Sequence, residues 1–149
     1  MITFQQELLY MVIDEVDALL KLHYEELTQN KDRIKLDPRW DEYAALERIG
    51  QLMVYTSRAD GALIGYAAFF LNRHLHYAGW LAAINDVIFL HPEHRKGSTG
   101  VRLIRFCEAQ AKAAGAHELV FHVKPGTVME KLITAMGYGL KETTRGKIL

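Results

Sequence analysis

The residues of this chain with the clearest chemical potential form a short basic segment rich in small side chains, Pro92 to Gly100. The segment follows an apolar run and precedes an amphipathic one, so it is expected to lead from a strand into a helix. The first N–H groups of a helix have no partner inside the helix, and the helix dipole adds partial positive charge there. Between His94 and Arg105 lie four Arg or Lys residues and no acid. Together these features predict a site for a phosphate-bearing ligand.

Two familiar phosphate motifs do not fit this segment. The nucleotide P-loop requires Gly, four residues and then Gly-Lys-Ser/Thr, but here Lys96 precedes Gly97 and no upstream glycine fits. The dinucleotide pattern Gly-x-Gly-x-x-Gly is also absent. The remaining pattern is Arg95-x-x-Ser98-x-Gly100 at the expected start of a helix.

The hydrophobic pattern predicts a mixed, mostly antiparallel sheet flanked by helices, an α/β (α+β) fold in a single domain over residues 1–149. The expected helices are 7–26, 40–49, 101–114 and 127–136. The expected strands are 2–4, 51–58, 62–71, 81–90, 118–124 and one or two short strands from Tyr138 onward. Asp60-Gly61 predicts a hairpin turn, and the strand–helix–strand unit over 81–124 predicts a right-handed parallel crossover.

The segment and its setting resemble the GNAT superfamily, the acetyl-CoA-dependent N-acetyltransferases. The family signature is Arg/Gln-x-x-Gly-x-Gly/Ala after an apolar strand, and Pro92 to Gly100 matches it with one departure, Ser98 in place of the first glycine. The predicted order of elements matches the family along essentially the whole chain, and residues 129–138 are similar to its late helix ending in Gly-Phe. A serine is small enough to preserve the loop, but a positive φ at this position would weaken coenzyme binding.

The resemblance implies that acetyl-CoA is the cosubstrate and that the loop binds its pyrophosphate. The residues assigned to this role are Arg95, Lys96, Gly97, Ser98, Thr99, Gly100 and Val101. In the family, a bulge in the preceding strand and splaying of the next one open a central parallel strand pair into a slot for the pantetheine arm. Backbone groups of Ile88, Phe89 and Leu90 are therefore expected to pair with that arm and with the thioester carbonyl.

Acetyl transfer to an amine requires a neutral amine and a proton for the departing thiolate. Asp86 is the expected base because it lies in a largely apolar strand, where burial would raise its pKa, although a structural role as a hydrogen-bond acceptor is an equal alternative. His122, on the adjacent predicted strand, is a second candidate. The family commonly has a tyrosine four residues before the glycine of the late helix, but Ile133 occupies that position. Tyr138 or a water is then left to protonate the thiolate.

The composition limits the partners of the chain. Its 149 residues include 18 Lys+Arg and 18 Asp+Glu, and this balance argues against nucleic acid. No apolar run approaches the roughly 18 residues of a membrane helix, and the N-terminus lacks a signal-peptide pattern. Cys107, the single cysteine, fits a core position in a cytoplasmic protein. His74 and His76 lack a third ligand at convincing spacing, so no metal is expected.

Two functions remain after these exclusions. The first is an acetyltransferase acting on a primary amine of a small molecule or a protein. The alternative is a CoA-binding interaction protein of weak catalytic power on the same fold, which the isoleucine at position 133 keeps open. The sequence leaves a homodimer open as well.

Overall fold

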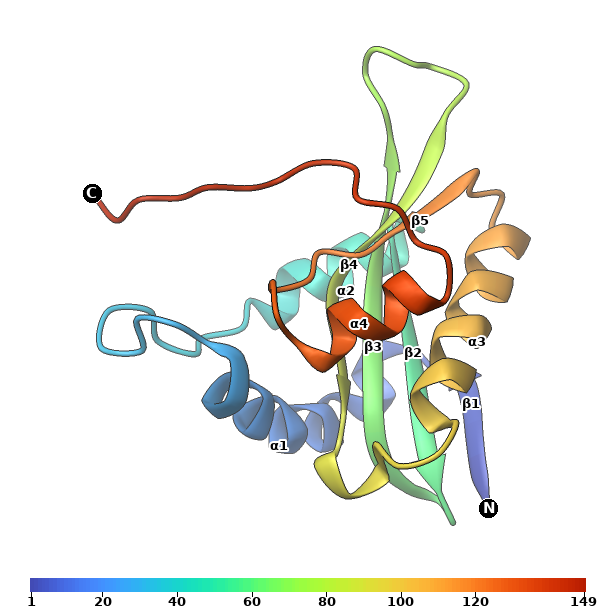
Figure 1. The fold of residues 1–149 in the computed structure, drawn as a ribbon. Helices are drawn as coiled ribbons and strands as arrows, with labels where there is room; N and C mark the ends of the chain where they lie inside the picture. Colours follow the sequence, from blue (N-terminus) through green and yellow to red (C-terminus); the bar gives the residue numbers. More distant parts are fainter.

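The computed structural model describes residues 1–149 and contains one five-stranded sheet with helices on both faces (Figure 1). The strands are β1 (Ile2–Gln6), β2 (Leu52–Ala59), β3 (Ala62–Arg73), β4 (Leu81–Leu90) and β5 (Glu118–Val120). They lie in chain order; β1 to β4 pair antiparallel, and β4 pairs parallel with β5. The helices are α1 (Leu9–Leu27), α2 (Trp40–Arg48), the 3-10 turn η1 (Pro92–His94), α3 (Thr99–Ala113) and α4 (Val128–Ala135). This arrangement confirms the predicted fold class.

Helices bury both faces of the sheet. Tyr55 and Phe69 pack in a cluster with Cys107 of α3, which is fully buried. Tyr66, three residues before Phe69 and therefore on the opposite face, packs with Val16 of α1. The middle of β3, residues 64–69, is thus a continuous apolar run, because every position in it is buried, whereas the ends of the strand are exposed.

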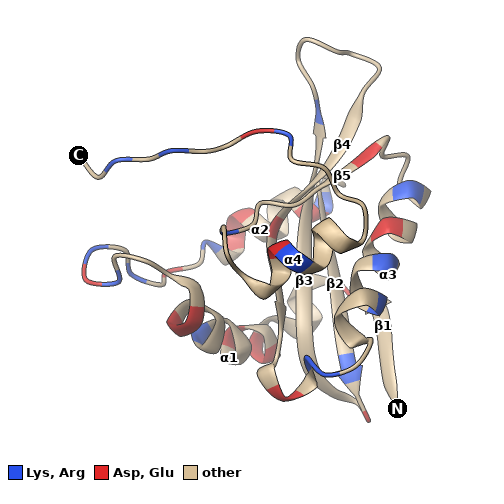
Figure 2. Ribbon diagram, viewed as in Figure 1, with Lys and Arg blue, Asp and Glu red and all other residues tan.

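Most of the charged residues lie on the helices and loops rather than on the central strands (Figure 2). Basic residues predominate in the loop before α3 and along α3, whereas acids predominate along α1. None of the helices combines the length and the apolar composition needed to cross a membrane.

The turn between β2 and β3 forms as predicted. Asp60 and Gly61 both have positive φ, 48° and 90°, as the type I′ turn of a two-residue hairpin requires. The carboxylate of Asp60 also accepts a hydrogen bond from the N-terminal amine of Met1. The turn therefore also holds the start of the edge strand β1.

Two strand predictions near the C-terminus are wrong. The strand expected over 118–124 ends at Val120, because the backbone at His122 bonds to a side chain of β4 instead of continuing the sheet. The strands expected from Tyr138 onward do not form, and residues 138–149 contain no helix or strand. This tail is mostly polar with two glycines, and Leu140 is 87% exposed, so it offers no apolar face that sheet pairing would bury.

Candidate active site

A bulge in β4 lies at Asp86, in the strand where the resemblance implied one. The register between β3 and β4 passes from a pair formed by Val87 to a pair formed by Asn85, so Asp86 has no partner of its own. Such a bulge brings two successive side chains to one face of the sheet. Asp86 bonds to Tyr43 of α2, and Val87 packs in the cluster beneath the same helix. The bulge therefore directs both residues toward the α1 and α2 face.

The strands β4 and β5 separate directly beyond the bulge. Their parallel pairing covers only residues 82–84 and 118–120. One residue further, the buried side chain of Asn85 takes the place of strand pairing, since its Oδ1 accepts a hydrogen bond of 2.5 Å from the backbone N–H of His122. A side chain between two backbones holds them farther apart than the about 4.8 Å of paired strands. The rest of β4, up to Leu90, consequently has a free edge.

Ile88 and Leu90 present their backbone groups on this free edge. Successive residues of a strand direct their N–H and C=O groups to opposite edges. The N–H of His91 donates to β3, so the N–H of Phe89 faces β3 as well and that of Leu90 faces away. The Leu90 carbonyl accordingly accepts a hydrogen bond from Arg95 outside the sheet. Of the three residues expected to pair with the pantetheine arm, Phe89 has its backbone directed to β3.

The N–H groups at the start of α3 have no partner in the protein. None of those from residues 96 to 101 donates to another backbone group or to a side chain. Gly97 has a left-handed φ of 66°, whereas Ser98, the residue preceding the helix, has an ordinary φ of −98°. The departure from the family signature at Ser98 therefore causes no backbone strain, because Gly97 absorbs the turn.

Helix α4 packs over the first turn of α3. A Cβ added to Gly100 would lie 3.4 Å from the side chain of Leu132. Thr99 is buried and Val101 is half-buried, so these two residues contribute backbone groups and packing rather than exposed side chains. Lys96 is exposed and supplies a mobile cation beside the N–H groups.

Arg95 is exposed, but its side chain is held by contacts within the protein. Its two terminal nitrogens donate to the two carboxylate oxygens of Glu26 at 2.7 Å each, and its Nε donates to the Leu90 carbonyl at 2.7 Å. The guanidinium lies over the ring of Phe89, 5.2 Å from its centroid. The hydrogen bonds from Arg95 lower the pKa of Glu26, so the Glu26 carboxylate is ionised at neutral pH. Arg95 thus joins the loop to α1 and to the end of β4.

The carboxylate of Asp86 is exposed, so the expected burial of this residue is wrong. The bulge accounts for the difference, because it turns the side chain to the rim between β4 and α2. There the hydroxyl of Tyr43 donates to Oδ2 at 2.5 Å. Burial and this hydrogen bond hold the pKa of Tyr43 above its usual range, so the phenol keeps its proton. The site has a carboxylate that is fixed by one neutral donor and open to water.

The other two catalytic candidates lie apart from Asp86. The side chain of His122 is exposed beyond the end of β5, and only its backbone N–H makes a specific contact. The hydroxyl of Tyr138 donates to Glu108 of α3 at 2.8 Å, and its ring packs edge-on against Phe121. Burial and the bond to Glu108 raise the pKa of Tyr138. Its contacts lie on the α3 face, opposite to that of Asp86.

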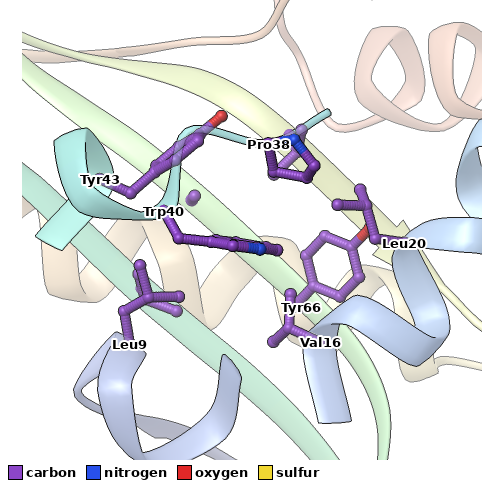
Figure 3. A pocket seen from close by; sticks show the side chains of 10 residues that line it. Leu9, Val16, Leu20, Pro38, Trp40, Tyr43 and Tyr66 are labelled. Atoms are coloured by element: carbon purple, nitrogen blue, oxygen red, sulfur yellow. The ribbon is translucent and has the colours of Figure 1, made fainter. Parts of the chain in front are cut away.

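An apolar pocket lies between α1, α2 and the sheet (Figure 3), and two of its lining residues, Tyr43 and Val87, are the hydrogen-bond partner and the chain neighbour of Asp86. Its empty volume, including the mouth, is about 430 Å³. It is lined by Leu9, Val16, Leu20, Pro38, Trp40, Tyr43, Val54, Tyr66, Ala68 and Val87. A second, more polar hollow shares Pro38 and Tyr43 with it and adds Asp37, Arg39 and Glu42. The two hollows adjoin at Pro38 and Tyr43, and the charged residues belong to the second one.

Sequence reasoning missed His23, which contacts Tyr66 in the lining of the apolar pocket. Its ring stacks on Phe89 at a centroid distance of 4.8 Å, and its Nδ1 shares a hydrogen bond of 2.8 Å with the Tyr66 hydroxyl. Burial lowers the pKa of His23, so the imidazole is neutral. The signal was present in the helical spacing, since His23 continues the buried stripe of Val12, Val16 and Leu19 along α1.

His74 and His76 lie on the exposed connection between β3 and β4. Their ring centroids are 5.5 Å apart, and Tyr77 lies 4.5 Å from that of His74. No set of three or more His, Cys, Asp or Glu side chains in the structure has the arrangement of a metal site. This connection therefore contributes an aromatic surface to the protruding hairpin of Figure 1.

Comparison with known proteins identifies the family signature over most of the chain. The model of the acetyltransferase (GNAT) family matches residues 16–138. The aminoalkylphosphonate N-acetyltransferase of Salmonella typhimurium (strain LT2) is 31% identical over 67 residues, which are 44% of this chain and 43% of that protein. The aligned region thus spans less than half the length of this relative.

Two solved structures share the fold over nearly their whole length. The ribosomal-protein-alanine N-acetyltransferase of Brucella melitensis biovar Abortus 2308 has a TM-score of 0.75 at 18% identity, covering 99% of this chain and 98% of that one. A predicted acetyltransferase of Clostridium acetobutylicum, solved with acetyl-CoA, has a TM-score of 0.73 at 13% identity, covering 100% and 96%. At these identities the likeness concerns the fold.

Proposed function

The chain belongs to the acetyltransferase (GNAT) family, and from this premise we propose that it transfers an acetyl group from acetyl-CoA to a primary amine. The observation that carries the proposal is the continuity of two features. The free edge of β4 at Ile88 and Leu90 leads directly to the unpaired N–H groups of residues 96–101. An extended amide chain ending in a pyrophosphate requires both of these features in this order.

The chain binds the coenzyme chiefly through its backbone. The N–H groups of residues 96–101 and the dipole of α3 receive the pyrophosphate, and Lys96 adds the nearby charge. Ile88 and Leu90 hydrogen bond with the pantetheine amides, and an N–H of this edge polarises the thioester carbonyl. Arg95 acts by position, because its contacts with Glu26 and Leu90 fix the loop against α1 and β4.

Asp86 receives the amine. Bound acetyl-CoA supplies the activated acetyl group, and the protein must present a neutral amine to it. The Asp86 carboxylate attracts the ammonium form and takes its proton, while the Tyr43 hydroxyl holds the carboxylate in one orientation. His122 is exposed at the far side of the opening and remains a second candidate for the same proton.

Water protonates the thiolate in this proposal. Tyr138 is the side-chain alternative, but its hydroxyl is bonded to Glu108 and its raised pKa makes it a weak acid. Ile133, at the position where the family commonly has a tyrosine, is buried and offers no proton. A CoA-binding protein of weak catalytic power remains the second candidate function, and these two residues are what favour it.

Thermal unfolding with and without acetyl-CoA tests the first step. At 100 times the dissociation constant a ligand adds about 2.7 kcal/mol of stability, which for a chain of this size raises Tm by roughly 5–11 °C. Acetyl-CoA is expected to produce such a shift and acetate none. Absence of a shift with acetyl-CoA would refute both functions.

Thiol release in the presence of amines tests the second step. Asp86→Asn should lower kcat about 10²- to 10⁴-fold and leave the acetyl-CoA thermal shift unchanged. Asp14→Asn removes another exposed acid, on α1, and serves as the matched control with wild-type rates. A thermal shift without thiol release from any amine would favour the CoA-binding protein. Equal rates for both variants at neutral pH would exclude Asp86 as the base.

A further inference from the structure

We infer that the amine accepted by this protein carries a compact apolar group, an alkyl chain or a single aromatic ring, which enters the pocket between α1, α2 and the sheet. This inference rests on the proposed function, since it names the class of acceptor for the same site. A strongly polar or polyionic amine is the class that the pocket disfavours.

The walls of the pocket carry the first part of the argument. Nine of its ten lining residues are hydrophobic, and the two hydroxyls of the lining are already bonded, that of Tyr66 to His23 and that of Tyr43 to Asp86. Only the indole N–H of Trp40 is left, so an acceptor with several hydroxyl or amino groups would lose their water there and leave most of them without a partner. An apolar group, by contrast, loses contact with water on both sides of the interface and is favoured.

The size and the flat walls of the pocket limit the apolar groups that it can accept. The empty volume of about 430 Å³ includes open solvent at the mouth, so the enclosed space is much smaller than this and admits only a compact substituent. Trp40 and Tyr66 supply flat walls (Figure 3), against which a ring or a short chain makes close contact.

Charge at the rim fixes the other end of the acceptor. Tyr43 lines both hollows and donates to Asp86. The second hollow adds Asp37, Glu42 and one base, Arg39, which pairs with Glu42. It therefore favours a cation, while Val87, the neighbour of Asp86, begins the apolar floor. An ammonium group at Asp86 with an apolar substituent beyond Val87 fits both parts.

A series of amines measures the preference directly. The rate of thiol release from acetyl-CoA is compared for propylamine, butylamine, hexylamine, phenethylamine and the polar 2-aminoethylphosphonate. Each added methylene is expected to raise kcat/KM about fourfold until the pocket is filled. The polar amine should react at least tenfold less efficiently than hexylamine. If kcat/KM does not rise with the length of the alkyl chain, or is higher for the polar amine, the inference is overturned while the proposed function stands.

Binding provides a readout that does not depend on turnover. Trp40 lines the pocket and the remaining tryptophan, Trp80, lies on the exposed hairpin, so the Trp80→Phe variant reports Trp40 fluorescence alone. Phenethylamine added in the presence of CoA should change this fluorescence saturably, and 2-aminoethylphosphonate should not. If no amine is acetylated but phenethylamine still binds, the proposed function fails and the pocket assignment stands. If phenethylamine does not bind, the inference is wrong.

A pair of variants on α1 locates the effect. Leu20 lines the pocket and is half-buried, so Leu20→Trp narrows the space from its rim. We expect at least a tenfold loss of kcat/KM for hexylamine, little change for propylamine and an unchanged acetyl-CoA thermal shift. Leu22→Trp, at a position 49% exposed on the same helix, is the matched control and should leave the series unchanged. Equal effects of the two variants would refute the assignment.

Discussion

Replacing Gly65 with alanine tests the packing of β3 against the part of β4 that we propose as the coenzyme edge. A Cβ at Gly65 would lie 2.7 Å from the Phe89 carbonyl oxygen and 2.9 Å from a methyl carbon of Leu90. The methyl group can rotate away, but the backbone oxygen can move only if the strands separate by several tenths of an ångström. This is the reason that position 65 of β3 requires glycine.

The expected loss of stability follows from two opposing contributions. Overpacking of this kind costs about 1–3 kcal/mol, while the smaller backbone entropy of alanine in the unfolded chain returns about 0.4–1 kcal/mol. A net loss of about 1–2 kcal/mol should lower Tm by roughly 2–8 °C. Because the strain falls on Phe89 and Leu90, Gly65→Ala should also reduce the affinity for acetyl-CoA.

Urea unfolding and calorimetric titration with acetyl-CoA measure the two effects. Gly79→Ala is the matched control, since its added Cβ meets nothing within 4 Å and its φ is not positive; it should match or slightly exceed the wild-type stability. The reasoning would be refuted by a Gly65→Ala protein as stable as the Gly79→Ala protein. If Gly65→Ala lowers the stability but leaves the affinity for acetyl-CoA unchanged, then the packing of β3 against β4 does not influence coenzyme binding.

Three further predictions concern the loop, an ion pair and the late tyrosine. Gly97→Ala meets no atoms but is forced into a left-handed conformation, so urea unfolding should show a loss of about 1–2 kcal/mol and titration a weaker acetyl-CoA affinity. Burial opposes ionisation of Glu7, but hydrogen bonds led by that from Arg58 hold its pKa below the usual value. The ionised Glu7 therefore stabilises the fold above the unfolded pKa of about 4.3, and this contribution is lost as the pH falls from there through the lower pKa of the folded state. Arg58→Met should accordingly make the free energy of unfolding depend less steeply on pH in the acid range. Tyr138→Phe removes the hydroxyl bound to Glu108 and should lower stability by about 1 kcal/mol with kcat unchanged; a tenfold fall in kcat would instead restore Tyr138 as the thiolate acid.

Much of the fold could be predicted from the sequence because its signals are local. The Asp60-Gly61 turn, the helical stripe of α1 and the run from β4 into α3 each depend on neighbouring residues. The prediction failed where the determinant was distant. The length of β5 depends on the side chain of Asn85, which lies 37 residues before the His122 N–H that it binds.

In the candidate site, too, the features set by neighbouring residues could be predicted and those set by distant residues could not. The proposed phosphate site consists of consecutive backbone groups, so a motif of nine residues was sufficient to predict that their N–H groups lie unpaired at the start of a helix. The partner of Arg95 lies 69 residues away in the sequence, and that of Asp86 43 residues away. The sequence indicated neither contact, and for this reason Asp86 was expected to be buried and Arg95 to be free for the ligand.

The β4 bulge connects the donor side of the site with the acceptor side. Asn85, on the α3 face of the sheet, bonds across to His122 and holds β5 away from β4. Asp86, the extra residue, turns to Tyr43, where the two hollows adjoin, and Val87 on the same face begins the apolar floor. In an unbulged strand these two residues would face opposite sides of the sheet, and the carboxylate could not lie beside the pocket. The bulge region therefore places Asn85, which keeps β5 from pairing with the end of β4, next to Asp86, the proposed base. Under the proposed function we expect changes at Asn85 to affect coenzyme binding and changes at Asp86 to affect turnover.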